Sequence, residues 1–286
     1  MSSEFHDFAG SAVVHLAGGV VALVGAVMLG PRIGRFTRRV GVAQYNFNEI
    51  QFNTFLQGQV EMIAHSIPLV SLGAFILVFG FFAFNGGSQA SITASGDGIA
   101  VSKAVVNTLV ACCVAGTTVL FLHKLLPGGK WSLLKIINGC IIGMVSICAG
   151  CDGYYPWAAA IVSCMSGFVY VFFSRLLLRL KVDDPVDAVA IHAGGGLLGV
   201  LCAPIFMEEG LVNTGSNESL KMLMWNAAGA GSIIVWHGIC GAAIFGLLKV
   251  LKLFRVLEAH ELEGLDVIKH SEPAYPKGIN ILNAST

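Results

Sequence analysis

Long uncharged apolar stretches dominate the chain and restrict its fold more than any other feature. Several run for 18 residues or more, about the length of a helix that crosses the hydrocarbon core of a bilayer. Such spans must be helices or a closed barrel, because lipid cannot satisfy an open backbone edge. Continuous runs favour helices, since the strands of a membrane barrel alternate apolar and polar residues. The sequence therefore predicts an all-α polytopic membrane protein.

The chain divides into a transmembrane domain, residues 1–255, and a polar cytoplasmic tail, residues 256–286. Residues 31–63 form the longest and most polar connection, which indicates an inner loop with room for a surface-lying helix. The seven predicted spans are residues 8–30, 64–84, 101–126, 133–150, 155–180, 186–206 and 228–252.

Composition excludes several classes of function. Charged residues make up only 12% of the chain, about half the share in a soluble domain. The net charge is zero, so no nucleic-acid partner is predicted. The 8 cysteines are scattered through apolar runs, and the pair Cys148 and Cys151 is interpreted as structural because no thioredoxin-like context surrounds it. We expect neither an enzyme nor a bound metal or cofactor.

The basic residues indicate how the chain is oriented. With the N-terminus outside, only Lys103 and Lys221 of the 17 lysines and arginines fall in outer segments. The positive-inside rule therefore predicts an external N-terminus and a cytoplasmic tail.

One motif occurs twice. Asp7 and Asp184 each precede a histidine by eight residues, and a small-residue run ending in Gly-Gly follows both His15 and His192. The two spans run in opposite directions, which is typical of an inverted repeat with a site near the bilayer midplane. Eight residues at about 1.5 Å each place a histidine about 12 Å below its aspartate. In a core about 30 Å thick, the two imidazoles then lie within about 6 Å in depth. We predict that they meet.

Other polar groups near these histidines are predicted to have simpler roles. Asp7 and Asp184 suit N-terminal caps, with attraction of cations as a further role. Asp187 is interpreted as an interfacial charge. His237, in the last span, has no counterpart in the repeat and is interpreted as a packing histidine.

Five stretches resemble the ammonium transporter (Amt/Mep/Rh) family, and the resemblance runs over nearly the whole chain. It implies an ammonium-transporter-like helical bundle whose seven spans correspond to family helices five to eleven. The first four family helices are then missing, so a truncated isoform or fragment is expected. The stretches are DFAGSAVVH (7–15), FFAFNGGS (81–88), CAGCDGYYPWAA (148–159), DDPVDAVAIHAGGG (183–196) and GLDVIKHSEPAY (264–275).

The resemblance also implies roles for individual residues. His15 and His192 match the family's twin pore histidines, and Phe84 matches a phenylalanine of the outer gate. Ser88 and Asp7 match residues of the outer site that recruits ammonium. Further matches are Phe81, where relatives often have tryptophan, the helix-breaking run 85–87, and the tail residues Gly264, Leu265 and Asp266, which match a segment that contacts the pores.

The resemblance implies transport of ammonium or ammonia across the cell membrane, by a homotrimer or by an assembly with full-length family members. One alternative stays open within the family, a non-conducting subunit or fragment that regulates full-length partners. Paired intramembrane histidines also suit a bis-histidine haem in a membrane cytochrome. A G-protein-coupled receptor shares the seven spans, but the chain has neither a D-R-Y-like end to its third span nor N-P-x-x-Y in its seventh.

Overall fold

The structure is a computed structural model that describes residues 4–36, 62, 64 and 66–272. Most of the predicted inner loop, 31–63, and the end of the tail lie outside the described residues. Seven helical segments within the described part are long and apolar enough to cross a membrane, as predicted. They are Ser11–Leu29, Ile67–Gly87 (α2), Asp97–Leu125 (α3), Leu133–Gly150, Pro156–Arg179 (α5), Val189–Phe206 and Asn217–Val250 (α8).

Three of these spans change helical form along their length. The first is a π-helix, Ser11–Leu16 (η1), followed by the α-helix Ala17–Leu29 (α1). The fourth is α4, Leu133–Ile147, with a 3₁₀ turn at Cys148–Gly150 (η2). The sixth repeats the pattern of the first. The remaining elements are η3 (Val189–Gly194), α6 (Gly195–Phe206), α7 (Leu211–Thr214), α9 (Glu258–Glu263) and α10 (Leu265–His270).

Serines and prolines explain several helix starts. The side chains of Ser66, Ser132 and Ser216 each accept a hydrogen bond from the backbone N–H three residues later, at the starts of α2, α4 and α8. This bond satisfies a donor that has no partner inside the helix. Pro156 is the first residue of α5, where its missing N–H costs nothing.

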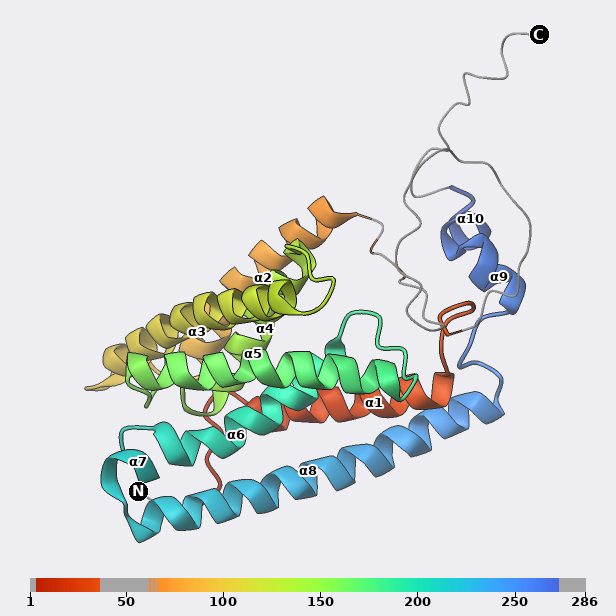
Figure 1. Ribbon diagram of the computed structural model, residues 1–286. Helices are drawn as coiled ribbons and strands as arrows, with labels where there is room; N and C mark the ends of the chain where they lie inside the picture. The colour runs from red at the N-terminus through yellow and green to blue at the C-terminus, as the bar shows by residue number, and fades with distance from the viewer. Residues whose placement is uncertain (1–3, 37–61, 63, 65, 273–286) are drawn as a thin grey trace, which may run out of the picture.

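The core lies between α3, α4 and α5, where small residues let the backbones approach (Figure 1). A Cβ atom on Gly143 would lie 2.3 Å from the carbonyl oxygen of Ala111, and one on Gly139 would lie 2.9 Å from that of Ala115. No side chain fits at either glycine without moving a backbone. Close approach through small residues is the usual basis of helix association in a bilayer.

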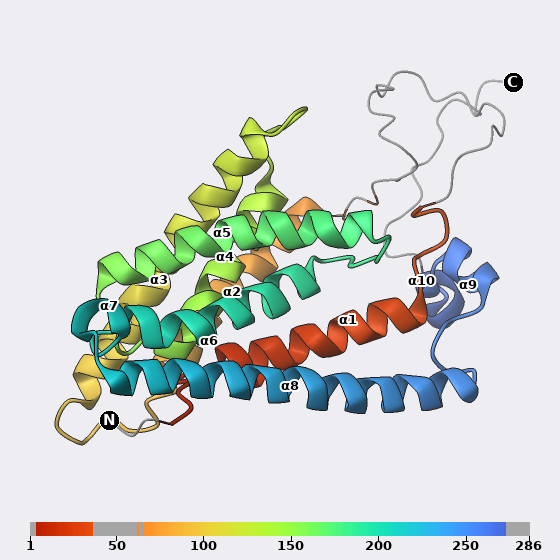
Figure 2. The same ribbon diagram turned by 60° about the horizontal axis from the view of Figure 1, so that its bottom comes forward.

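The helix of the last span, α8, begins at Asn217, before the predicted start of the span at residue 228. The capped first turn and a buried amide extend the helix through a polar stretch. Asn226 donates to the carbonyl oxygens of His6 and Val200 at 2.9 and 2.7 Å, and it accepts from the His6 N–H at 2.8 Å. As a result α8 runs alongside both α1 and α6 (Figures 1 and 2).

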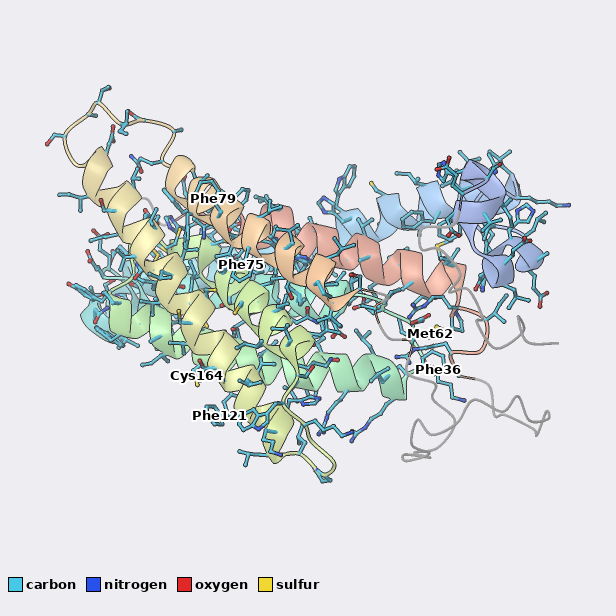
Figure 3. All side chains as sticks on the ribbon, turned by 90° about the horizontal axis from the view of Figure 1, so that it is seen from above. Phe36, Met62, Phe75, Phe79, Phe121 and Cys164 are labelled. Atoms are coloured by element: carbon cyan, nitrogen blue, oxygen red, sulfur yellow. The ribbon has the colours of Figure 1, made fainter. Side chains whose placement is uncertain are left out.

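The helices alternate in direction, so the ends of α1, α5 and α8 lie together with α9 and α10 (Figure 2). This is the end that the charge distribution predicts to be cytoplasmic. By contrast, α2 and α8 bury little of their surface within the chain. On α2, the side chains of Phe75 and Phe79 point outward and are each 75% exposed (Figure 3).

Candidate functional site

The two copies of the repeated motif adopt the same local structure. Each is an aspartate, then a six-residue π-helix that contains the histidine, then an α-helix. His15 lies in η1 and His192 in η3. π-Helical turns are rare, and they occur frequently at functional sites. The sequence analysis predicted the repeat and missed the π-helical form.

The aspartates cap these π-helices, as predicted for them. Asp7 Oδ2 accepts hydrogen bonds from the N–H groups of Ala12 and Val13, both at 2.9 Å. Asp184 accepts from two N–H groups of its own helix, at 2.9 and 2.7 Å. Burial raises the pKa of both carboxyls above the usual value, although the backbone donors act in the opposite direction.

The two imidazoles are in contact, which confirms the predicted proximity. Their Nδ1 atoms lie 3.2 Å apart, and the rings stack with centroids 5.2 Å apart and an interplanar angle of 12°. Because a neutral imidazole has one donor and one acceptor nitrogen, one Nδ1 must donate to the other. The Nε2 atom of His15 is buried without a hydrogen-bond partner among the described residues.

Close backbone packing holds the pair together. A Cβ atom on Gly19 would lie 2.1 Å from the backbone nitrogen of Ala193, the residue after His192. In the symmetric position, a Cβ on Gly196 would lie 2.6 Å from the nitrogen of Leu16, the residue after His15. The glycines that follow each histidine therefore allow the two crossing helices to bring the rings into contact.

Two phenylalanines of α2 cover His15. Phe81 stacks on its ring at 5.7 Å and 14°, and Phe84 lies 5.9 Å away at 59°. The two phenyl centroids are 6.0 Å apart. The prediction assigned Phe84 to the gate, whereas the structure brings Phe81 equally near. Helical spacing gives a signal for this, since residues three apart share a helix face.

Among the described residues, neither Ser88 nor Asp7 forms a hydrogen bond with the imidazoles. Ser88 Oγ donates to the carbonyl oxygen of Phe84 at 2.8 Å, a helix-end hydrogen bond, and the carboxylate of Asp7 accepts from the backbone N–H groups of its helix start. Asn85 is fully buried and donates to Thr108 Oγ1 at 2.9 Å, so its role is structural.

Asp187, predicted to be an interfacial charge, is the acceptor of a partly buried network just before the sixth span. It accepts from the Tyr170 hydroxyl at 2.5 Å and from Lys135 Nζ at 3.0 Å. Ser174 and Asn138 donate to it at 3.0 and 3.1 Å. Burial alone would raise the pKa of this carboxyl, but Lys135 and the other donors hold it below the usual value.

The tail docks through a residue that the sequence analysis did not single out. Glu261 in α9 accepts from the Ile33 N–H at 2.9 Å and from Arg255 at 2.9 and 3.0 Å. The predicted tail segment follows immediately, from Gly264 to Asp266. This tail segment lies beyond the end of α1. The length of α1 is about 20 Å, and the histidines lie near its other end, at its start. The structure does not bring it to the histidines.

Ion pairs beside the tail join the end of the first span to the start of the sixth. Asp183, the neighbour of Asp184, accepts from Arg32 Nε at 2.7 Å and from Arg32 Nη2 at 2.9 Å, and it pairs with Arg35 at 3.4 Å. Burial raises the pKa of Asp183, but hydrogen bonds and charge from Arg32 outweigh this, so its pKa lies below the usual value.

Several side chains beside the pair face outward. Val13 and Val14 are 53% and 46% exposed, and Phe84 is 40% exposed. The described residues thus form one wall beside the imidazoles and leave the opposite side uncovered.

The geometry of the histidine pair does not suit a bis-histidine haem. The two histidine rings of such a haem lie on opposite sides of the iron, each about 2 Å from it, whereas here the rings stack with their nitrogens 3.2 Å apart. His237 donates its Nδ1 proton to the Ile233 carbonyl at 2.9 Å, which fits the packing role.

Comparisons with known proteins agree with this architecture. The family model described as Ammonium Transporter Family matches residues 1–275. The chain is 40% identical to the Caenorhabditis elegans protein named "Putative ammonium transporter 1", over 96% of this chain and 51% of that protein. It is 32% identical to ammonium transporter 1 member 3 of Solanum lycopersicum, over 94% of this chain and 59% of that protein. The chain thus spans about half the length of the curated relatives it matches.

Solved structures give the same fold. A structure titled "Sensor Amt Protein" superimposes with a TM-score of 0.76 and 30% identity, covering 93% of this chain and 60% of that one. Candida albicans Mep2 superimposes with a TM-score of 0.72, covering 88% of this chain and 52% of that one, and at 24% identity it supports the fold alone. The protein is a multi-pass membrane protein, and it belongs to the ammonium transporter family.

Proposed function

We propose that this chain takes part in moving ammonium or ammonia across a membrane, and that His15 and His192 line the narrow part of the path. The observation that carries the proposal is the contact of the two rings at 3.2 Å, presented by two oppositely directed π-helical turns. Membership of the family supports the substrate. The process is transfer without covalent change, so no enzymatic group is required.

The chemistry of the pair suits a small nitrogen base. Moving a bare ammonium ion into a low-dielectric interior is costly, whereas neutral ammonia crosses readily. Two linked neutral imidazoles offer one outward nitrogen that donates and one that accepts. Ammonia can do both. The buried Nε2 of His15, with no partner among the described residues, is the atom available for this contact.

The two phenylalanines beside His15 select ammonium and exclude water. Phe84 is exposed enough to meet a cation, and the face of an aromatic ring attracts ammonium. Ser88 donates its own proton to the Phe84 carbonyl, so its oxygen lone pairs remain free to accept from ammonium. Phe81 is 6% exposed and stacks on His15, where it excludes water. Asp7 contributes negative charge beneath this outer end.

The uncovered side beside Val13 and Val14 supports a second candidate role. A closed lumen needs a second wall over these side chains, so assembly with further protein is part of the proposal. Either a homotrimer or a complex with full-length family members could provide it. In the second role the chain conducts nothing itself and changes transport by full-length partners through its tail.

Expression in a cell that lacks ammonium uptake tests both roles. Growth on low ammonium with the chain alone would show that it conducts. A changed uptake rate only when a full-length relative is co-expressed would show the regulatory role. If the chain reaches the membrane and changes neither, both roles are wrong.

The histidine pair is tested with His192→Ala in whichever setting gives transport. We expect uptake of ammonium or methylammonium to change at least tenfold, or selectivity to be lost. His237→Ala is the matched control, because among the described residues that imidazole bonds only to its own helix, and it should leave uptake unchanged. Equal uptake by His192→Ala and the unmodified chain would remove the pair from the mechanism.

A further inference from the structure

A cavity of about 220 Å³ opens where α3, α4 and α5 meet, at the end of the molecule predicted to be cytoplasmic. It lies between the loop after α3 and the last turns of α5. This volume is roughly seven times that of a liquid water molecule, enough for a phosphate with part of a glycerol. The residues on its wall that carry the argument are Val119, His123, Lys135, Val171, Ser174 and Arg175.

The lining is basic. His123, Lys135 and Arg175 reach the cavity, and no acidic side chain of the described part of the chain lines it. Lys135 is paired with Asp187 at 3.0 Å, so those two charges offset each other. Arg175 forms neither a hydrogen bond nor an ion pair with the described residues. The cavity therefore carries an uncompensated positive charge.

His123 is oriented for a ligand. Its Nδ1 lies 2.9 Å from the carbonyl oxygen of Lys130, and because a carbonyl only accepts, Nδ1 carries the proton. The other ring nitrogen, Nε2, then accepts in the neutral ring and donates only when the ring is the imidazolium. As the imidazolium, His123 and the guanidinium of Arg175 offer a pair of donors suited to a phosphate.

Aromatic side chains place the cavity at a membrane surface. Trp131 is 60% exposed, Lys124 Nζ lies 5.7 Å from its ring centre, and its ring packs edge-on against Phe121. Tryptophan beside lysine at the ends of spans marks the membrane–water interface. The apolar part of the wall, from Val119 and Val171, continues toward exposed apolar residues of α5 such as Phe172.

We propose that this cavity binds the phosphate headgroup of an anionic phospholipid from the predicted cytoplasmic leaflet. Arg175 and His123 hold the phosphate, and the acyl chains lie along the apolar surface of α3 and α5. Charge and position favour a lipid over a free anion, because a basic pocket between spans at this face is open to headgroups and to acyl chains at once. This site is separate from the histidine pair and does not depend on transport.

The test is native mass spectrometry of the purified full chain in detergent, titrated with dioleoyl phosphatidic acid and, in parallel, with dioleoyl phosphatidylcholine. We expect at least one molecule of phosphatidic acid to bind more tightly than phosphatidylcholine. Arg175→Gln should weaken phosphatidic acid about fivefold, the effect of removing one cation near a headgroup. Arg179→Gln removes the same charge one turn further along α5, outside the cavity, and should have little effect.

A second variant distinguishes the effect of the cavity's volume from the effect of its charge. Val171→Phe fills the apolar part of the cavity, retains every cation, and should also weaken phosphatidic acid. Far-ultraviolet circular dichroism confirms that each variant keeps its helices. Equal weakening by Arg175→Gln and Arg179→Gln would overturn the proposal, because it would show attraction to the surface in general. Competition by millimolar inorganic phosphate at the same potency as the lipid would overturn the assignment to a headgroup.

Discussion

Three neighbouring side chains at the histidine pair stack on one another. Phe81, His15 and His192 stack one after another, with interplanar angles of 14° and 12°. Phe84 closes this row from the side. Aromatic pairs in such arrangements contribute about 0.5–1.5 kcal/mol beyond the area they bury. The row therefore both fixes the orientation of His15 and covers it.

Phe81→Leu tests the covering role. Leucine keeps much of the bulk and removes the stacked ring, so we expect His15 to become more accessible to water and the site to lose selectivity. In proteoliposomes of a transporting assembly, potassium leak should rise relative to ammonium flux. Phe79→Leu is the control, since that side chain is 75% exposed on the same helix. An equal leak in both variants would refute the role of Phe81.

At the scale of elements, the repeated unit is an aspartate cap followed by a wide π-helical turn. Asp184→Ala removes the acceptor for the N–H groups of Ala188 and Val189. We expect a loss of about 1 kcal/mol of stability, while Asp184→Asn keeps an acceptor and loses less. Thermal unfolding in detergent measures the melting temperatures of the two variants. A melting temperature lower for the asparagine than for the alanine would contradict the capping role.

A pH dependence belongs to the ion pair between Arg32 and Asp183. The pKa of Asp183 in the folded chain lies below its usual value of 3.8. The pair therefore stabilises the fold above about pH 3.8, and this stabilisation is lost as the pH falls through the lower folded value. Since Arg32 is 39% exposed, we expect at most about 1 kcal/mol. Arg32→Gln should lower the melting temperature at pH 7, and the difference should shrink in acid. A difference in melting temperature that stays constant across this pH range would contradict the role of the ion pair.

The spans could be predicted because apolar length is a local property of the sequence. The meeting of His15 and His192 followed from helix rise and membrane thickness. The early start of α8 could not be predicted, because Asn217–Lys221 is polar and its helix depends on the Ser216 cap and on remote partners of Asn226. The π-helical turns were also missed, since the width of a turn depends on contacts made elsewhere in the fold.

At the scale of the whole molecule, the tail is fastened to the end of the first span. Glu261 accepts from the Ile33 N–H and from Arg255, and Arg255 also donates to the carbonyl oxygens of Leu29 and Pro31. These bonds join α9 to the same end at which Arg32 holds Asp183. The tail and both repeated spans thus meet at one end of the protein, while the histidines lie deeper.

Glu261→Ala tests this fastening. We expect the Ile33 amide to lose its acceptor and its hydrogen exchange to become faster, because α9 no longer covers it. Hydrogen–deuterium exchange with mass spectrometry measures the peptide that contains Ile33. Glu263→Ala, on an exposed position of the same short helix, is the control. Unchanged exchange in Glu261→Ala would show that the contact is not maintained in solution.

The two π-helical turns have a consequence for how this protein tolerates change in length. Each turn holds one residue more than an α-helical turn would, so deleting one residue within Ser11–Leu16 or Val189–Gly194 lets the turn tighten to ordinary helix. Because the wide turn already contains the extra residue, the helical segments on either side of it would keep nearly the same relative orientation, and only the side chains inside the turn would change direction. A deletion in the α-helical part of either span has no such relief, and it would rotate the side chains after it by about 100° relative to those before it. The two wide turns are therefore the places in these spans where the loss of one residue disturbs the flanking helices least.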